Sequence, residues 1–176
     1  MKKFLCAVLM ICLLMSAAMA ETATTELSWE TFVPVLEAAE LGGQFHTFSE
    51  VSAKMWLPEG MNPVELTEEN KANGYIACFA PDDNSTQVTV VYTNVNGMSA
   101  EEYAAAVSKI EGTTEIEVVT VNGLPCVTYK MPEKDVVCGA FVTEAGYVLE
   151  ITCFPASFEH ADVLWGAVVC SVQPAE

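Results

Sequence analysis

The sequence predicts an α+β fold in which helices flank a mostly antiparallel sheet. Helix-like and strand-like segments come in blocks, in the order helix, strands, helix, four strands, helix, and strands grouped in this way usually pair antiparallel. The four successive strands are joined by short turns, as antiparallel neighbours can be. Some strands carry apolar residues on both faces, as at Val136, Val137 and Phe141. Such strands need cover on both sides, which indicates helices on the two faces of the sheet.

The first half of the chain predicts one helix and a set of strands. Ser28 can cap the helix, and the glycines at 42 and 43 are expected to end it. Pro34 indicates that the helix is kinked or begins nearer Pro34. Its apolar stripe, spaced i, i+3, i+4, i+7, consists of Trp29, Phe32, Val33 and Leu36. We expect strands over 53–57, 74–80 and 86–92, a strand-like segment around 45–48, and irregular structure over 66–73.

The second half contains the clearest local pattern. Ser99 and Glu102 form a capping box, in which each side chain bonds the other's backbone N–H, so a helix is expected to start at Ser99. Its inner face is predicted to be Tyr103, Val107 and Ile110, with Gly112 as its end. Four strands follow over 115–121, 124–131, 136–143 and 147–154, and Asn122–Gly123 predicts a type I′ hairpin between the first two.

The chain is predicted to close with a helix and a short strand. Ser157 is expected to cap the helix, and a short terminal strand is expected over 170–173. The inner face of the helix would be formed by Phe158, Ala161, Trp165 and Val168.

The N-terminus has the three parts of a secretory signal peptide. Lys2 and Lys3 are followed by the apolar run 4–15 and by small residues before Glu21. A membrane anchor is disfavoured because the apolar run is shorter than the roughly 20 residues of a spanning helix. A lipoprotein site at Cys12 is a weaker alternative, because bulky Ile11 precedes it. We therefore predict a signal peptide over 1–20, a lead-in and helix over 21–42, and one α+β domain over 43–176.

Acidic charge dominates the composition. The chain has 24 Asp and Glu residues against seven Lys and no Arg, a formal charge of −17. Cleavage would remove two lysines and no acid, which changes this to −19 over 156 residues. Such a charge repels nucleic acid and anionic lipid, so neither is an expected partner. We expect a monomer with no membrane span after cleavage, whose partner is an unidentified protein or small ligand.

Two segments of the chain resemble PsbP-like domains. One is the strand and turn over Trp56–Gly60, and the other is the helix running into a Ser-containing strand over Trp165–Val172. With the hairpins between them, the resemblance covers 43–173. That family includes the extrinsic photosystem II protein, a nuclear-import factor and many secreted bacterial proteins. The resemblance implies an α/β/α sandwich and no particular activity, because this fold carries unrelated functions. The metal-binding histidines of photosynthetic members match no position in this sequence.

The cysteines and histidines are the candidates for a thiol-based site. Cys153 and His160 are the pair most open to that interpretation, and His46 is the other histidine, but no local motif supports a nucleophile. Cys138 and Cys153 would lie opposite each other if their hairpin had a two-residue loop, and would point to opposite faces with a three-residue loop. We expect free, buried thiols. The cysteines beyond the predicted cleavage site are Cys78, Cys126, Cys138, Cys153 and Cys170.

The other polar and aromatic groups are explained by structure. The segment 82–85 (Asp-Asp-Asn-Ser) lacks EF-hand spacing and predicts a turn rather than a calcium site. Two acidic groups, one at 65–69 and one at 101–102, predict solvated surface and helix-start acids. Trp29, Trp56 and Trp165 predict core packing rather than a carbohydrate groove. We therefore assign no catalytic, cofactor-binding or metal-binding residue, and expect no cofactor.

The function hypothesis is a secreted or envelope-associated, non-enzymatic binding or accessory domain. It follows from a well-patterned domain without a recognisable catalytic set. Two alternatives remain, namely a small secreted thiol-dependent hydrolase and an acidic inhibitor or partner of basic proteins.

Overall fold

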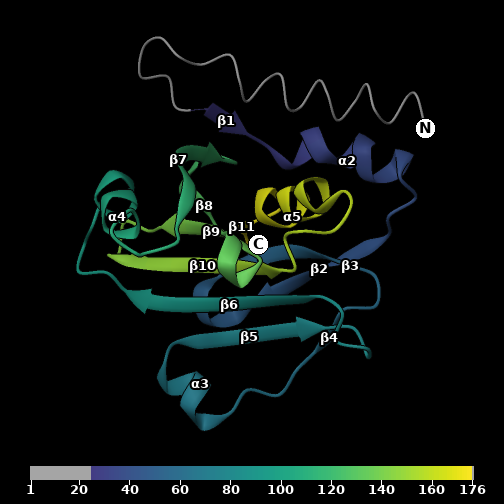
Figure 1. Cartoon of the computed structure of the whole chain (residues 1–176), viewed down its shortest axis with the longest axis horizontal. Coiled ribbons are helices and arrows are strands. Elements are labelled where there is room, and N and C mark those ends of the chain that lie inside the picture. The colour runs from purple at the N-terminus through teal and green to yellow at the C-terminus, as the bar shows by residue number, and fades with distance from the viewer. Residues whose placement is uncertain (1–24, 176) are drawn as a thin grey trace.

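The computed structural model describes residues 25–175, so the predicted signal peptide lies outside the described residues. Two sheets form the fold: an eight-stranded sheet ordered β1-β7-β8-β9-β10-β6-β5-β4, and a three-stranded sheet ordered β11-β3-β2 (Figure 1). Every pairing is antiparallel except β1 with β7. The predicted α+β class with a mostly antiparallel sheet is confirmed, whereas the separate small sheet was not predicted.

The bounds of the elements agree closely with the predicted ones in the second half of the chain. The large sheet contains β1 (Thr25–Leu27), β4 (Asn62–Pro63), β5 (Tyr75–Ala80), β6 (Gln87–Asn94), β7 (Thr114–Val121), β8 (Leu124–Met131), β9 (Val136–Val142) and β10 (Tyr147–Phe154). The small sheet contains β2 (Gly43–Phe48), β3 (Ala53–Pro58) and β11 (Gln173–Pro174). The helices are α2 (Trp29–Ala38), α3 (Glu68–Ala72), α4 (Ala100–Val107) and α5 (Ala161–Cys170), with short 3-10 helices η1 (Ser49–Val51) and η2 (Pro132–Lys134).

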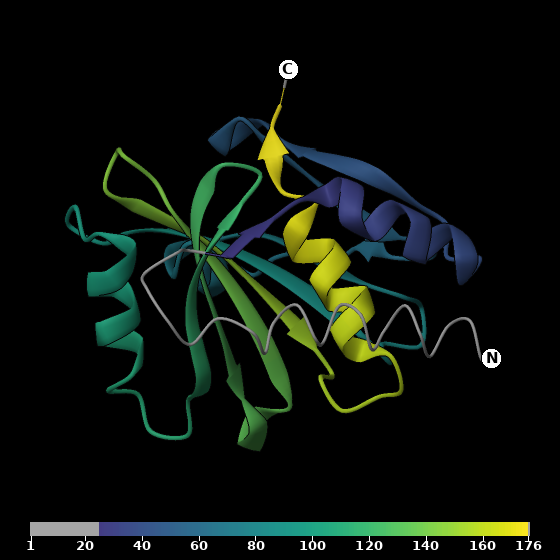
Figure 2. The ribbon, with the colours of Figure 1, turned by 90° about the horizontal axis from the view of Figure 1, so that it is seen from above.

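The two faces of the large sheet are covered by different elements. Helix α4 packs on one face, over β7, β8 and β9, while α5 and the small sheet cover the other (Figure 2). Helix α2 lies outside α5 and packs against it. The larger core cluster lies on the α5 side and the smaller one lies under α4. Both faces are therefore apolar, as the strand sequences predicted.

Close packing around α5 depends on two glycines. A Cβ at Gly139 of β9 would lie 2.6 Å from Val169 Cγ1, and a Cβ at Gly166 would lie 3.0 Å from the Phe32 ring of α2. Val169 and Phe32 thus occupy space that any side chain at the glycines would fill. Helix α5 touches the sheet on one side and α2 on the other, and Trp165 within it is 1% exposed.

Several predicted helix details are wrong. Helix α5 begins at Ala161 with His160 as its N-cap, because Ser157 Oγ donates to Asp135 Oδ2 at 2.8 Å instead of capping. The α4 capping box is confirmed, but the helix ends at Val107, so Ile110 falls in the following turn and is 49% exposed.

The N-terminal helix and the segment after β3 also differ from expectation. Pro34 lies inside α2. Phe32 and Leu36 of the predicted stripe are buried, but the third buried residue is Val35 rather than Val33. The segment predicted as irregular contains α3, whose N-cap Thr67 accepts the Asn70 N–H.

The Asn122 side chain joins three distant segments. Its position in the β7–β8 turn has φ of 49°, as the predicted I′ hairpin requires, and Gly123 follows with φ of 78°. The side-chain oxygen accepts the Trp29 N–H at 3.1 Å, and the amide nitrogen donates to Cys170 O and Val172 O, both at 2.8 Å. One amide therefore holds the start of α2 and the end of α5 to the large sheet.

Substitution of Asn122 by glycine is expected to destabilise the fold without disturbing the turn. Glycine accepts the positive φ but loses three hydrogen bonds, each worth about 1 kcal/mol. We expect a loss of about 3 kcal/mol of unfolding free energy in urea denaturation. Asn96→Gly is the matched control, because Asn96 also has a positive φ of 56° in a turn. Equal effects of the two substitutions would contradict the role of the Asn122 amide.

Candidate binding cleft

A cleft of about 280 Å³ opens where the small sheet meets the outer edge of the large sheet. Residues 46–50, from the end of β2 and η1, form one wall. The other wall is formed by residue 63 at the end of β4, by residues 64 and 66 after it, and by residues 76–79 of β5. This volume is large enough to admit one long side chain. The cleft exists because these two sheet edges are not hydrogen-bonded to each other.

The cleft combines aromatic side chains with exposed apolar surface. The His46 ring lies edge-on against Phe79, with centroids 4.6 Å apart, and lies 6.0 Å from the Phe48 ring. Val64 on the opposite wall is 40% exposed. An exposed valine beside aromatic rings offers apolar contact area to a ligand.

An acidic side chain lines the cleft. Glu50 is exposed there, with one carboxylate oxygen 3.4 Å from Ser49 Oγ. Its negative charge favours a positively charged ligand.

Cys78, His46 and Glu50 all line the cleft, but their side chains do not form a catalytic set. Successive residues of a strand point to opposite faces. Phe79 meets His46 on the inner face of β5, whereas the Cys78 thiol points to the other face, where its Sγ lies 3.1 Å from Gln87 Nε2. The strand backbone therefore separates the thiol from the imidazole.

The five cysteines of the described residues are free and buried, as expected. The β9–β10 hairpin pairs Cys138 with Thr152 rather than with Cys153, so the three-residue alternative holds and the two thiols face opposite sides. Burial raises the thiol pKa of Cys138 to about 11 and that of Cys170 to about 12. Burial also raises the pKa of Cys126 and Cys153. Thiols with raised pKa values stay protonated at neutral pH and are therefore poor nucleophiles.

The Cys153 and His160 hypothesis is not supported by their positions. Cys153 is completely buried on β10. The His160 side chain is 49% exposed at the start of α5, with its Nε2 3.5 Å from a Glu159 oxygen. Because the thiol is buried and the imidazole is at the surface, the two groups cannot act together on one substrate.

A polar cluster under α4 was missed from the sequence. The O–H groups of Tyr103 on α4 and Tyr129 on β8 both donate to Glu150 Oε2 at 2.7 Å. Burial, followed by the nearby Glu150 charge, raises the pKa of both phenols above the ordinary value of about 10. Both phenols therefore stay protonated at neutral pH and keep donating to Glu150. Because Tyr103 is on α4 and Glu150 is on β10, these hydrogen bonds fix α4 to the sheet. The alternation in β10 predicted which way Glu150 faces, but no local pattern indicates its distant partners.

The remaining candidates have the structural roles expected of them. Asn84 N–H donates to Pro81 O in the β5–β6 turn, and the Ser85 N–H lowers the pKa of the Asp83 carboxyl by bonding it. Glu68 pairs with Lys71 at 2.8 Å. Glu102 belongs to the α4 capping box, and Glu101 accepts a bond from Ser99 Oγ. Trp56 and Trp165 are buried in the core, and Trp29 packs against it.

The described residues contain no cluster of three or more His, Cys, Asp or Glu side chains arranged to hold a metal ion. Within the same range, no helix is long and apolar enough to cross a membrane.

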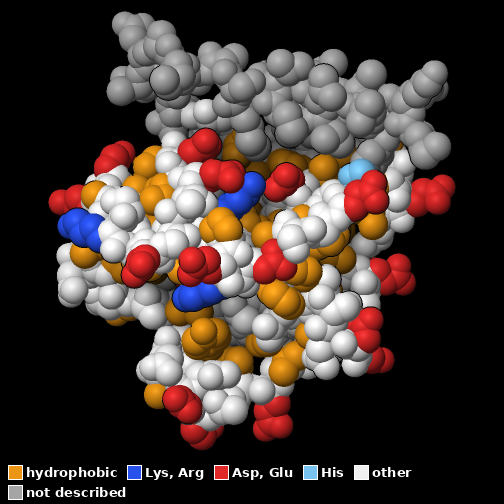
Figure 3. Space-filling view, viewed as in Figure 1, with side chains coloured by type: hydrophobic (Ala, Val, Ile, Leu, Met, Phe, Trp, Pro, Cys, Tyr) orange, Lys and Arg blue, Asp and Glu red, His pale blue; other side chains and the backbone are white. Residues whose placement is uncertain are grey.

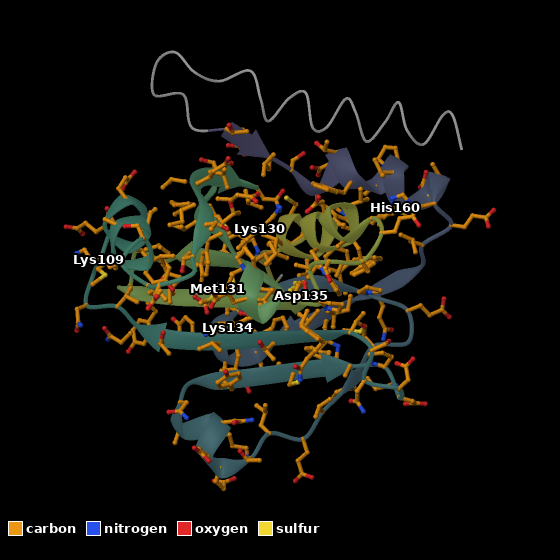
Figure 4. The ribbon with its side chains drawn as sticks, viewed as in Figure 1. Lys109, Lys130, Met131, Lys134, Asp135 and His160 are labelled. Atoms are coloured by element: carbon orange, nitrogen blue, oxygen red, sulfur yellow. The ribbon has the colours of Figure 1, made fainter. Side chains whose placement is uncertain are left out.

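Basic side chains do not form a continuous surface on the face shown in Figures 3 and 4. Lys109 follows α4, whereas Lys130 and Lys134 lie near η2, with acidic side chains between them. Lys130 itself lies 2.9 Å from Glu115 and 3.6 Å from Asp162. This face lacks the basic stripe that a nucleic-acid backbone needs.

The fold is PsbP-like. No family model and no curated protein matches the chain. Among solved structures, it is similar to cyanobacterial PsbP (CyanoP) from Synechocystis sp. PCC 6803, with a TM-score of 0.55 and 12% identity over 75% of this chain and 92% of that one. It is also similar to a Bacteroides thetaiotaomicron protein, with a TM-score of 0.48 and 14% identity over 76% and 49% of the two chains. For the Saccharomyces cerevisiae Ran-binding protein Mog1p the TM-score is 0.45, with 12% identity over 77% and 97%. At these identities the likeness concerns the fold alone.

Removal of the Tyr129 hydroxyl should weaken the fold in a pH-dependent way. A hydrogen bond to a charged group contributes about 1.5–3 kcal/mol, so Tyr129→Phe should lower the unfolding free energy by that amount at pH 7. The folded pKa of Tyr129 is raised above the unfolded value, so the contribution is complete below about pH 10 and declines above it. Denaturation curves should therefore show the variant to be less stable than the parent at pH 7, and this difference should become much smaller at pH 11. Tyr75→Phe, on half-buried β5, is the control; an undiminished difference at pH 11 would contradict the argument.

Proposed function

We propose that this protein is an extracytoplasmic, non-enzymatic binding domain whose cleft accepts a positively charged segment of a partner protein. The observation that carries the proposal is the cleft beside His46, where apolar surface is open to solvent and the exposed Glu50 forms part of the wall. A basic side chain with a long apolar stem matches both features, because its stem contacts apolar surface while its charged end stays near the carboxylate.

The distribution of reactive groups favours binding over catalysis. His46 and Cys78 line one cleft but are separated by the β5 backbone. The other thiols of the described residues are buried with raised pKa values. A thiol-dependent hydrolase needs an accessible thiolate next to a base, and neither arrangement supplies one.

Net charge supports a cationic partner. The formal charge of −17 attracts basic proteins over distances of about a Debye length and disfavours self-association. The hypothesis of an acidic partner of basic proteins and the hypothesis of a binding domain therefore both propose the same binding surface, the cleft beside His46.

Random peptides displayed on phage provide the test of the cleft. Binders to the protein comprising residues 21–176 should be enriched in Lys and Arg, and Val64→Asn should weaken them at least about tenfold by disrupting the apolar wall without adding charge. Ile110→Asn is the matched control, because Ile110 is an exposed apolar residue in the turn after α4. Binders that tolerate Val64→Asn, or turnover in a hydrolase substrate panel, would overturn the proposal.

The extracytoplasmic location rests on the Lys2–Lys3 start, the apolar run and the small residues before Glu21. Expression of the full chain in a bacterial host should give a protein whose N-terminal residue is Glu21, measured by intact mass. Ala20→Gln should block this processing, since small residues are needed next to the cleavage site. Recovery of the intact precursor in the cytoplasm from the unaltered sequence would refute the location.

A further inference from the structure

The free edge of β2 differs from the other sheet edges of the described residues. An unpaired strand edge can pair with another chain, and proteins usually protect it by shortness, proline or charge. Strands β4 and β11 have two residues each and both contain proline, and β1 has three residues with Glu26. In contrast, β2 has six residues with neither proline nor a charged Asp, Glu, Lys or Arg.

The backbone groups that β2 presents at this edge follow from one hydrogen bond. Trp56 on β3 donates its N–H to Ser171 Oγ at 2.8 Å, on the side away from β2. Phe45 lies opposite Trp56, so this pair exchanges no ladder bonds. The N–H and C=O of Phe45, and by alternation those of Thr47, therefore point outward at the free edge. Both residues are exposed.

The β2 edge borders the cleft. The side chains of His46 and Phe48 face the large sheet, and residues 46–48 form part of the cleft wall. A strand paired with Phe45 and Thr47 would place the residue opposite His46 on the cleft side, because side chains alternate along strands. The edge would supply hydrogen bonds, while the cleft would select the side chain.

We propose that an extended segment of a partner protein pairs with β2 as a fourth strand of the small sheet, placing a Lys or Arg side chain in the cleft opposite His46. This inference rests on the proposed function and adds the mode of binding and the class of partner. Glu50 in the cleft wall favours the basic side chain. A second copy of this chain is disfavoured as the occupant, because each copy carries a formal charge of −17.

The experiment uses an acetylated and amidated heptapeptide of alternating threonine and valine with lysine at the centre. Binding of this peptide to residues 21–176 is followed by NMR with amide hydrogen exchange. The amides of Phe45 and Thr47 should become protected from exchange. N-methylation of the two threonines beside the lysine should weaken binding at least about tenfold, because it removes the N–H groups that would bond to β2.

Two protein variants separate the edge from the cleft. Thr47→Pro removes an outward N–H, which the β2–β3 ladder does not use, and should abolish binding, whereas Thr47→Val should retain it. Glu50→Gln should weaken binding about threefold or more at low salt, and Glu133→Gln, in the exposed 3-10 helix η2, should not. If Thr47→Pro fails to fold, amide protection in the parent protein decides the question.

The outcomes distinguish this inference from the proposed function. Val64-dependent peptides that leave the Phe45 and Thr47 amides unprotected would overturn strand addition and leave cleft binding intact. Absence of binding by the heptapeptide at millimolar concentration, or a dimer in light scattering that protects the same amides, would also overturn strand addition. If no peptide binds in a way that depends on Val64, both strand addition and the proposed cleft binding would be overturned.

Discussion

The structure depends on the burial of α5, which is apolar on almost every side. Seven of its ten residues are buried, whereas an ordinary surface helix buries one stripe. The large sheet covers one side through Gly139, and α2 covers another through the Phe32 ring at Gly166. The small sheet covers part of the remainder through β3. Each of these elements comes from a different part of the chain, so the packing of α5 brings the N-terminal, early and C-terminal segments together.

The cleft is a geometric consequence of that packing. Helix α5 and the small sheet lie on the same face of the large sheet, but among the described residues no backbone hydrogen bonds join the two sheets. Side chains such as His46, Phe48 and Phe79 fill the space between them only in part. Where two sheets meet through side chains rather than backbone bonds, a strand edge and a hollow occur next to each other. The cleft and the adjacent β2 edge can therefore form from residues that otherwise have ordinary roles in core packing.

Local chemistry allowed much of the second half of the chain to be predicted. The α4 capping box, the Asn122–Gly123 turn and the four strands after Gly112 depend on neighbouring residues and were found at or near the predicted positions. Ser157 misled the prediction of α5, because a cap is chosen by competition and Asp135, 22 residues away, takes its hydroxyl. The small sheet was missed because its C-terminal strand, β11, lies more than 100 residues from its other two strands.

The candidate site was harder to predict because its residues are unremarkable in sequence. His46 was identified as a titratable residue in a strand-like segment, but the opposite wall of the cleft comes from 63–66 and 76–79, which no local pattern connects to it. Glu150 likewise meets Tyr129 and Tyr103 only after β8, β10 and α4 have packed. Strand alternation, by contrast, is a local rule with a functional consequence. It places the Cys78 thiol and the ring of its neighbour Phe79 on opposite faces of β5, so the strand backbone separates this thiol from His46, which contacts Phe79.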